Sequence, residues 1–375
     1  MAGIYIHIPF CKQACHYCDF HFSTSLKHKD DMIRALQAEI GWRKDELGNE
    51  KIETIYFGGG TPSVLSVDEI NKLIMAVHQH FEVTSDPEIT LEANPDDLSK
   101  DKIKELSQTP INRLSIGVQS FFDDDLLLMN RSHNAQNAYE SVAEARKYFD
   151  NITLDLIYGI PNMSMEKWQA NIDKALALNV PHISSYALTV EPKTALHHLI
   201  QKGEIPLPDD GVAHEHFLRL VEVLQANGFV HYELSNFGLP GYFSQNNTAY
   251  WQGKKYLGIG PSAHSFDGIS RSWNVANNVR YIQHIDQQNL PSEKEYLSLA
   301  DRYNEYIMTG LRTIWGVSLD KIQADFGAKF ENYLRHNAQK HLDNQQLIIE
   351  GNHLKTTLQA KFFTDGIASD LFWVE

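Results

Sequence analysis

The chain contains only three cysteines among its 375 residues, Cys11, Cys15 and Cys18, and all three lie in one short segment. An odd number of thiols cannot be paired completely in disulfides. Three thiols are also one fewer than the four ligands that complete a structural zinc site. The cysteines therefore favour metal or redox chemistry over a framework of disulfides.

Signals for membrane insertion and export are also missing. The chain contains no run of about 18 apolar residues, which is the length needed to cross a bilayer. Residues 1–10 lack the charged segment followed by a long apolar segment that marks a secretory leader. We therefore expect a cytoplasmic protein without an integral membrane segment.

Basic charge is scarce. The chain has 33 Lys and Arg against 48 Asp and Glu, a formal net charge of −15, and no basic cluster. Proteins that bind nucleic acid gather Lys and Arg on one face to contact phosphates. We therefore expect no nucleic-acid partner.

What the sequence does contain is a regular alternation of short apolar runs with longer amphipathic segments. It predicts helices near residues 29–47, 66–81, 99–108, 135–148 and 165–178 and strands at 3–8, 52–57, 88–93, 113–118, 152–159 and 182–188. Repeated strand–helix units indicate an α/β fold with a parallel sheet covered by helices. Six units, where a TIM barrel has eight, would leave a partial barrel with an open side.

The alternation divides the chain into three parts: the partial barrel at 1–235, an irregular connecting segment at 236–290 and a C-terminal domain at 291–375. The last part predicts helices near 295–313, 318–326 and 329–342, a two-stranded wing around Gly351-Asn352 and a final helix after Ala360. This order is typical of a winged-helix-like domain. The acidity of the chain favours a lid or a partner surface over DNA binding.

Polar groups follow or interrupt several of the predicted strands. Cys11 follows the first, a Gly-Gly-Gly-Thr-Pro run (58–62) follows the second, and Glu92, Gln119 and Asp155 lie in the next three. In parallel α/β folds the carboxyl ends of the strands meet at one edge, where ligands bind. Asp155 is the strongest of these indications, because a carboxylate inside an apolar strand is costly unless it is paired.

Two metal centres are compatible with the cysteines. Zinc would need His7, His16 or His21 as a fourth ligand, but zinc sites usually take their cysteines from two separated pairs. An iron–sulfur cluster bound by three thiolates fits the compact spacing better. Such a cluster would leave one iron open to a small molecule.

The motifs resemble those of a known superfamily. Cys-x3-Cys-x2-Cys followed by Gly-Gly-Gly-Thr-Pro resembles the radical S-adenosylmethionine proteins. The segments YIHIPFC, EANP, GVQSF and DLIYGIP are similar to the branch of oxygen-independent coproporphyrinogen III dehydrogenases and HemW heme chaperones. The resemblance covers essentially the whole chain and implies a partial (β/α)6 barrel. It also implies a [4Fe–4S] cluster on the three cysteines, whose open iron binds S-adenosylmethionine and whose electron releases a 5′-deoxyadenosyl radical.

The resemblance further implies which residues bind the cofactors. Tyr5 and the backbone at Tyr17 would lie beside the cluster and S-adenosylmethionine, and Gly59, Gly60 and Thr61 would meet the methionyl end. The rest of S-adenosylmethionine would contact Glu92, Gln119, Arg131, Asp155 and Ala187.

Two departures separate the chain from the dehydrogenases, which carry one more cysteine two places after the third and an N-terminal extension. Phe20 occupies that cysteine position here, and only ten residues precede Cys11. The branch of heme chaperones is therefore favoured, with heme, apo-hemoproteins and a one-electron donor as partners. A homodimer is compatible with the sequence. Oxidative decarboxylation of coproporphyrinogen III stays the main alternative, and a radical enzyme acting on another substrate, including RNA, is a third.

The heme motif of the family is altered at one position. The family pattern His-Asn-x-x-Tyr-Trp reads Asn-Asn-Thr-Ala-Tyr-Trp at 246–251, with Asn246 in place of histidine. An amide is a poor ligand for heme iron. We therefore expect Tyr250 and Trp251 to contact the porphyrin, and His264 to bind the iron, with His231 or Tyr250 as other candidates.

Overall fold

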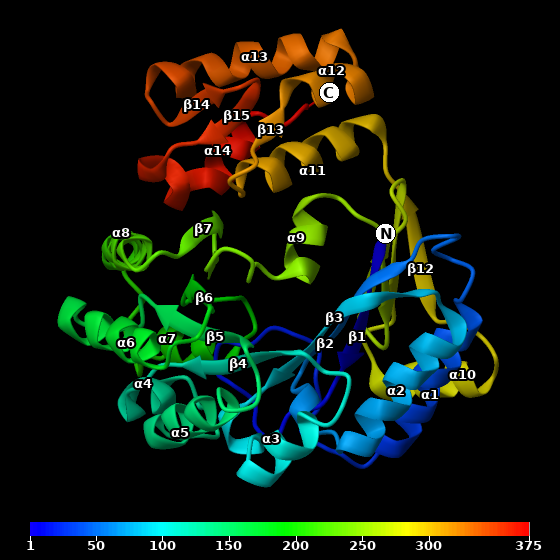
Figure 1. Ribbon diagram of the computed structural model, residues 1–375. Coiled ribbons are helices and arrows are strands. Elements are labelled where there is room, and N and C mark those ends of the chain that lie inside the picture. Colours follow the sequence, from blue (N-terminus) through cyan, green and yellow to red (C-terminus); the bar gives the residue numbers. More distant parts are fainter. Residues whose placement is uncertain (375) are drawn as a thin grey trace.

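The computed structural model describes residues 1–374, which form a large α/β domain and a smaller C-terminal domain (Figure 1). The large domain contains one 12-stranded sheet. Six central strands pair in parallel in chain order, from the first to the last: β1 (Ala2–Ile8), β2 (Ile52–Gly59), β3 (Val83–Ala93), β4 (Arg113–Gln119), β5 (Asn151–Tyr158) and β6 (His182–Ala187). These strands agree with the six that the sequence predicts.

Helices connect the parallel strands: α1 (Lys29–Trp42), α2 (Val67–His80), α3 (Lys100–Leu106), α4 (Asp123–Leu128), α5 (Ala135–Ala145) and α6 (Met165–Ala177). Short 3-10 turns follow β2 and β3 at Pro62–Val64 and Pro95–Asp97. Helix α2, which the sequence predicts near residues 66–81, begins with a capping box in which Ser66 and Glu69 exchange hydrogen bonds. After β6 the chain continues through α7 (Ala195–Gln201) and α8 (Asp210–Ala226).

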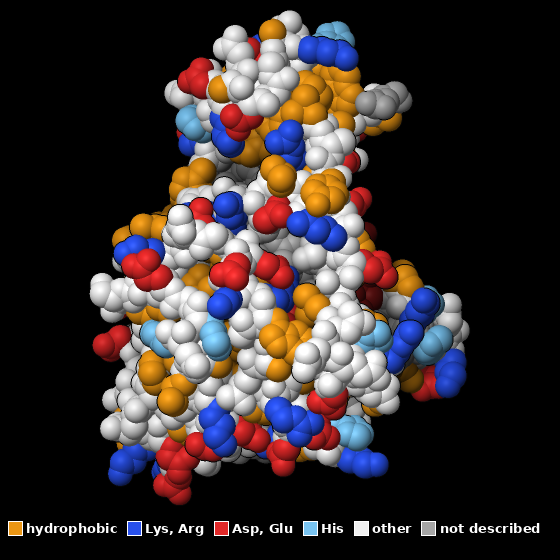
Figure 2. Space-filling model, turned by 90° about the vertical axis from the view of Figure 1, so that its right-hand side faces the viewer, with side chains coloured by type: hydrophobic (Ala, Val, Ile, Leu, Met, Phe, Trp, Pro, Cys, Tyr) orange, Lys and Arg blue, Asp and Glu red, His pale blue; other side chains and the backbone are white. Residues whose placement is uncertain are grey.

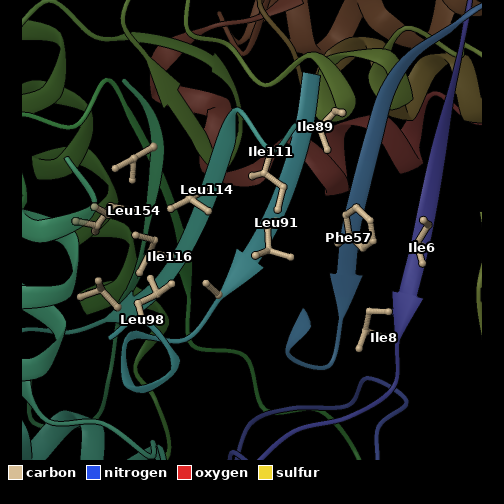
Figure 3. Packing of buried hydrophobic residues seen from close by; sticks show 14 of the residues in the cluster. Ile6, Ile8, Phe57, Ile89, Leu91, Leu98, Ile111, Leu114, Ile116 and Leu154 are labelled. Carbon is tan, nitrogen blue, oxygen red and sulfur yellow. The ribbon is translucent and has the colours of Figure 1, made fainter. Parts of the chain in front are cut away.

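The two faces of the central strands differ in chemistry because side chains alternate along a strand. One face carries fully buried apolar residues, such as Ile6, Phe57, Leu91 and Leu114, which pack together along neighbouring strands (Figure 3). The intervening positions are polar. They face the interior of the barrel, which is where the candidate site lies.

The segment 236–290, predicted to be irregular, is largely ordered and belongs to the large domain. It forms β8 (Asn236–Gly238), α9 (Gln245–Trp251), β9 (Tyr256–Ile259), β10 (His264–Phe266), β11 (Ser270–Asn274) and α10 (Asn278–Asp286). Strand β9 pairs in parallel with β1, and β10, β11 and β12 (Ser292–Tyr296) extend the sheet in antiparallel order. Leu257, Ile259 and Ile282 join the same hydrophobic core as the central strands. Pairing with a distant strand, which local sequence patterns do not reveal, orders this segment.

The sheet does not close into a barrel. Its two end strands are β12 and β7 (Val230–Glu233), which pair with β11 and β8 and, among the described residues, not with each other. The model therefore confirms a partial barrel of the α/β class. The C-terminal domain lies above the barrel, beyond α9, as Figure 1 shows.

The C-terminal domain has its own hydrophobic core. It consists of α11 (Leu299–Leu311), α12 (Leu319–Phe326), α13 (Ala328–Asp343), a 3-10 helix (Leu358–Phe363), α14 (Thr364–Asp370) and the strands β13 (Val317–Ser318), β14 (Leu347–Glu350) and β15 (His353–Thr356). The predicted wing corresponds to the β14–β15 hairpin, which β13 extends to three strands. Contacts to the barrel include a backbone bridge between Glu233 and Thr313.

Two features of the structure concern membrane-spanning helices and surface charge. Within residues 1–374 no helix is both long and apolar enough to cross a bilayer. On the face in Figure 2, basic and acidic side chains are interspersed, without a continuous basic patch.

Candidate functional site

Two adjoining cavities open into the barrel and the space beside it. The smaller has a volume of about 610 Å³ and the larger about 1040 Å³, within or near the range of about 300–1,000 Å³ typical of small-molecule sites. Six residues line both cavities: Tyr5, Asp19, Phe20, Gly59, Glu92 and Tyr250. Ligands in the two cavities would therefore be neighbours.

The smaller cavity brings together the three cysteines and nine of the ten residues that the resemblance assigns to S-adenosylmethionine: Tyr5, Tyr17, Gly59, Gly60, Thr61, Glu92, Gln119, Arg131 and Asp155. Ala187, the tenth, does not line the cavity. It pairs with Tyr158 at the end of β6, while Tyr186 and Thr189 on either side of it do reach the cavity.

The cysteine loop is fixed to the ends of β1 and β2 by backbone hydrogen bonds. Cys11 N–H donates to Ser23 O over 3.0 Å, and Thr61 N–H donates to Phe10 O over 2.7 Å. The Thr61 hydroxyl also donates to Cys11 Sγ over 3.4 Å. The loop therefore keeps its shape through contacts with the glycine-rich turn.

Glycine is required in that turn because other chain segments approach it closely. A Cβ atom at Gly60 would lie 2.6 Å from Phe10 O and 2.8 Å from Ile8 O. Gly59 has a φ of 107°, in the region that favours glycine, and a Cβ there would lie 2.4 Å from the His7 ring. The triple glycine thus lets the cysteine loop and the second strand pack against each other.

Arg131 is the cation closest to the thiols. Its Nη1 lies 3.3 Å from Cys15 Sγ and 3.4 Å from Tyr17 Oη, and its Nη2 donates to Asn94 Oδ1 over 2.7 Å and to Gly117 O over 2.9 Å. Its Nε is buried and has no hydrogen-bond partner among the described residues. This part of the cavity is suited to an anionic group.

Burial raises the pKa of the Cys11 and Cys18 thiols to about 11. In the metal-free chain these two thiols are therefore protonated at neutral pH. Only the thiolate is a strong metal ligand, so metal binding here would release protons.

The three histidines considered as zinc ligands have other partners. His7 Nε2 bonds to His21 O at 2.9 Å, His16 Nδ1 to Leu128 O at 2.8 Å, and His21 Nε2 to Asn278 Oδ1 at 2.7 Å. Among residues 1–374, no three His, Cys, Asp or Glu side chains converge closely enough to bind one metal ion. The three cysteines line one cavity, which is compatible with a cluster in which each thiolate binds a different iron.

Two buried carboxylates, those of Glu92 and Asp155, also line the smaller cavity. Glu92 Oε1 accepts a hydrogen bond from Tyr56 Oη over 2.7 Å, and Asp155 Oδ1 lies 3.5 Å from Ser115 Oγ. Burial raises the pKa of each to about 7, and the mutual repulsion of the two carboxylates adds to the shift at Asp155. A cationic ligand would stabilise the ionised form of both.

Several inner residues have no counterpart in the sequence-based assignment: Tyr56, Asn94, Arg113, Ser115, Thr153, Ser184 and Tyr186. All but Asn94 occupy alternate positions in β2, β4, β5 and β6, on the same face as the predicted residues. A search for polar residues at every second position of each strand, in place of strand ends alone, would have found them. Tyr186 is the clearest case, since its hydroxyl donates to Gln119 Oε1 over 3.2 Å.

The larger cavity lies between the barrel and the C-terminal domain. Tyr250, Trp251 and His264, the three residues predicted to contact heme, all line it. His231 lines neither cavity; its ring stacks on Phe237 at 4.2 Å and bonds to Leu234 O at 3.1 Å. Of the two histidines considered as iron ligands, His264 therefore lines a cavity and His231 does not.

Asn246 faces the barrel. It is 3% exposed and lines the smaller cavity, while Trp251 at the other end of α9 lines the larger one. Glu88 accepts hydrogen bonds from the backbone N–H groups of Gln245 and Asn246, each over 3.1 Å. These bonds fix the start of α9 above β3.

Comparisons with known proteins agree with this arrangement. Residues 5–175 match the radical SAM superfamily model, and residues 297–363 match that of the HemN C-terminal domain. The structure aligns with coproporphyrinogen III oxidase (HemN) from Escherichia coli with a TM-score of 0.86, covering 99% of this chain and 90% of that one at 22% identity. Fold and site together define a radical S-adenosylmethionine protein.

Two similar proteins show to which family within this superfamily the chain belongs. The heme chaperone HemW of Bacillus subtilis is 36% identical over 335 residues, which cover 88% of each chain. The heme chaperone HemW of Mycobacterium tuberculosis is 32% identical over 376 residues, covering 98% of this chain and 94% of that one. The chain belongs to the HemW family.

Proposed function

We propose that the chain is a heme-binding chaperone that carries a [4Fe–4S] cluster and S-adenosylmethionine and inserts heme into apo-hemoproteins. The observation that carries this proposal is the 1040 Å³ cavity between the two domains, which adjoins the cavity of the cysteines. The names of the curated relatives support the same function.

In this proposal Cys11, Cys15 and Cys18 bind the cluster, and the residues around them fit its charge. When bound, the cluster would supply one electron at a time, received from a one-electron donor. Arg131 balances the negative charge of the thiolates, and the Thr61 hydroxyl donates to the Cys11 sulfur. The buried Nε of Arg131 supports this role, because it has no partner in the described part of the chain.

S-adenosylmethionine would occupy the rest of the smaller cavity. It is a sulfonium cation with an amino group and ribose hydroxyls, all of which a carboxylate can stabilise. Glu92 and Asp155 supply two carboxylates, and Gly59 and Gly60 expose backbone beside the thiols. Tyr5, Tyr17, Gln119 and Arg131 complete this proposed site, while the position of Ala187 at the end of β6 makes it a more distant neighbour.

Heme would lie in the larger cavity. Tyr250 and Trp251 offer aromatic surface to the macrocycle, and His264 offers an imidazole for the iron. Phe20 is 68% exposed and lines both cavities. It would separate heme from the cluster at the position where the dehydrogenases have a cysteine.

One anaerobic experiment tests the proposal against its main alternative. The chain is reconstituted with iron and sulfide, and the same preparation is assayed for heme binding and for consumption of coproporphyrinogen III. The chaperone function predicts a stoichiometric heme spectrum, no decarboxylation, and transfer of heme to an apo-hemoprotein. Decarboxylation without a heme spectrum would instead establish the dehydrogenase.

A further inference from the structure

The larger cavity has one wall from each domain. The barrel contributes β10 and β11, including His264 and Arg271. The C-terminal domain contributes one face of α11, where Arg302, Glu305, Tyr306 and Thr309 follow each other at helical spacing. A ligand in this cavity would therefore contact both domains at once.

Two arginines on these opposite walls have unused hydrogen-bonding capacity. The Nε atoms of Arg271 and Arg302 are buried and have no partner among residues 1–374. The described ion pairs include one for Arg271, with Glu305 at 3.0 Å between Nη2 and Oε1, and none for Arg302. Both arginine side chains line the cavity and are only partly buried, so their terminal N–H groups can donate up to two parallel bonds to a carboxylate ligand.

The other charged groups that line the cavity have partners of their own or lie at the end that it shares with the smaller cavity. Lys321 is already paired with Asp325 and lies 5.5 Å from the centre of the Tyr306 ring. Asp19 and Glu92 lie at the end shared with the smaller cavity. Asp325 is engaged by Lys321, and Glu305 is the acid paired with Arg271. Burial raises the pKa of Glu305. Its charged form is thus disfavoured where it stands.

We propose that Arg271 and Arg302 bind the two propionate carboxylates of heme, and that a propionate displaces Glu305 from Arg271. This inference rests on the proposed heme function and specifies its ligand as a tetrapyrrole with free carboxylates. The Arg271–Glu305 pair joins β11 to α11. Heme would exchange this contact between the domains for bonds from both domains to its own carboxylates.

The test compares two ligands on one protein: heme, and heme dimethyl ester, in which both propionates are esterified and uncharged. Affinities are measured by absorbance titration of the full chain in the same detergent. The wild type should bind heme at least about tenfold more tightly than the ester, as expected for charge-assisted hydrogen bonds. Arg271→Gln and Arg302→Gln should each weaken heme binding about tenfold with little effect on the ester. The double variant should bind both ligands alike.

Arg280→Gln is the matched control, since Arg280 is an exposed arginine on α10 outside both cavities. It should leave both affinities unchanged. A variant that fails to fold would lose both ligands, whereas the inference predicts selective loss of heme over its ester. Glu305→Gln should strengthen heme binding, because it frees Arg271.

The outcomes separate this inference from the function on which it rests. If the wild type binds neither ligand, the heme function fails and the inference fails with it. If the wild type binds heme but the two arginine variants bind it equally well, the heme function stands and the propionate site is wrong. Weaker heme binding in Glu305→Gln would overturn the displacement of Glu305.

Discussion

Asn246 accepts a hydrogen bond from the hydroxyl of Thr54, with 3.0 Å between Oδ1 and Oγ1, in the buried contact between α9 and β2. This bond holds the side chain against the barrel, where it is 3% exposed. The position that carries histidine in the family motif is therefore a packing position in this chain. The proposed heme contacts come from the other end of α9 and from β10.

The first prediction follows from this separation. Asn246→Ala should lower the free energy of unfolding by about 1–3 kcal/mol, because it leaves the buried Thr54 hydroxyl without its acceptor, and should change the heme spectrum little. His264→Ala should shift the Soret band and weaken heme binding with little effect on stability, since His264 is exposed to the cavity. Absorbance titration and thermal denaturation of both variants check this. If Asn246→Ala weakened heme binding and His264→Ala did not, the iron would lie at the end of α9 that carries Asn246.

The second prediction concerns the cluster. Reconstituted protein should contain about four irons and four sulfides per chain. Each of the variants Cys11→Ser, Cys15→Ser and Cys18→Ser should lose the cluster. His7→Ala, His16→Ala and His21→Ala should retain the iron, because these rings bond to other groups. Iron and sulfide analysis with the visible spectrum provides the measurement. Stoichiometric zinc without iron–sulfur absorbance would contradict the prediction.

The third prediction concerns S-adenosylmethionine. Glu92→Gln and Asp155→Asn should each weaken its binding about ten- to a hundredfold, corresponding to about 1.5–3 kcal/mol for a hydrogen bond to a charged group, while the cluster stays intact. In the wild type the affinity should rise with pH up to about pH 7, where Glu92 and Asp155 ionise. Calorimetric titration of S-adenosylmethionine at several values between about pH 5.5 and 8 would show this dependence, since protein ligands bind metal in their deprotonated form and the cluster must stay intact. Equal affinities in wild type and both variants would show that these carboxylates do not contact the ligand.

The fourth prediction applies to the ligand-free chain. The folded protein holds the Glu92 and Asp155 protons more tightly than the unfolded chain, since the pKa of each rises from its ordinary value to about 7. Their contribution to stability should therefore be complete below about pH 4 and should be lost as pH rises to about 7. The double variant Glu92→Gln/Asp155→Asn should show a smaller fall in melting temperature over this range. An identical pH profile would contradict the shifted pKa values.

The fifth prediction tests the glycine-rich turn. Gly60→Ala should destabilise the fold by more than about 1 kcal/mol and reduce cluster content, because its Cβ would meet the backbone oxygens of Ile8 and Phe10. Gly366→Ala is the control: it lies in α14 with open space around it, and alanine there should stabilise the helix by up to about 1 kcal/mol. Thermal denaturation compares the two. A neutral Gly60→Ala would show that the two loops can separate without loss.

The order of the central elements could be predicted because their signals are local. Runs such as residues 52–57 and 113–118 are apolar and bounded by turn residues, and the Ser66–Glu69 capping box marks a helix start. Strands β9, β10 and β11 could not be predicted in the same way. They are three to five residues long, and β9 is ordered by pairing with β1, more than 200 residues earlier in the chain.

By itself, the sequence predicted the cysteines, glycines and acidic residues that line the smaller cavity. The spacing of the cysteines, the glycine run and the acidic positions of the strands are properties of short segments, and parallel pairing brings the ends of such segments together. Only the tertiary structure decided that Ala187 lies outside this cavity, that Asn246 packs against Thr54, and that Arg271 meets Glu305. The physical reason is that the larger cavity forms where two separately packed domains meet, so its walls come from segments that no local pattern connects.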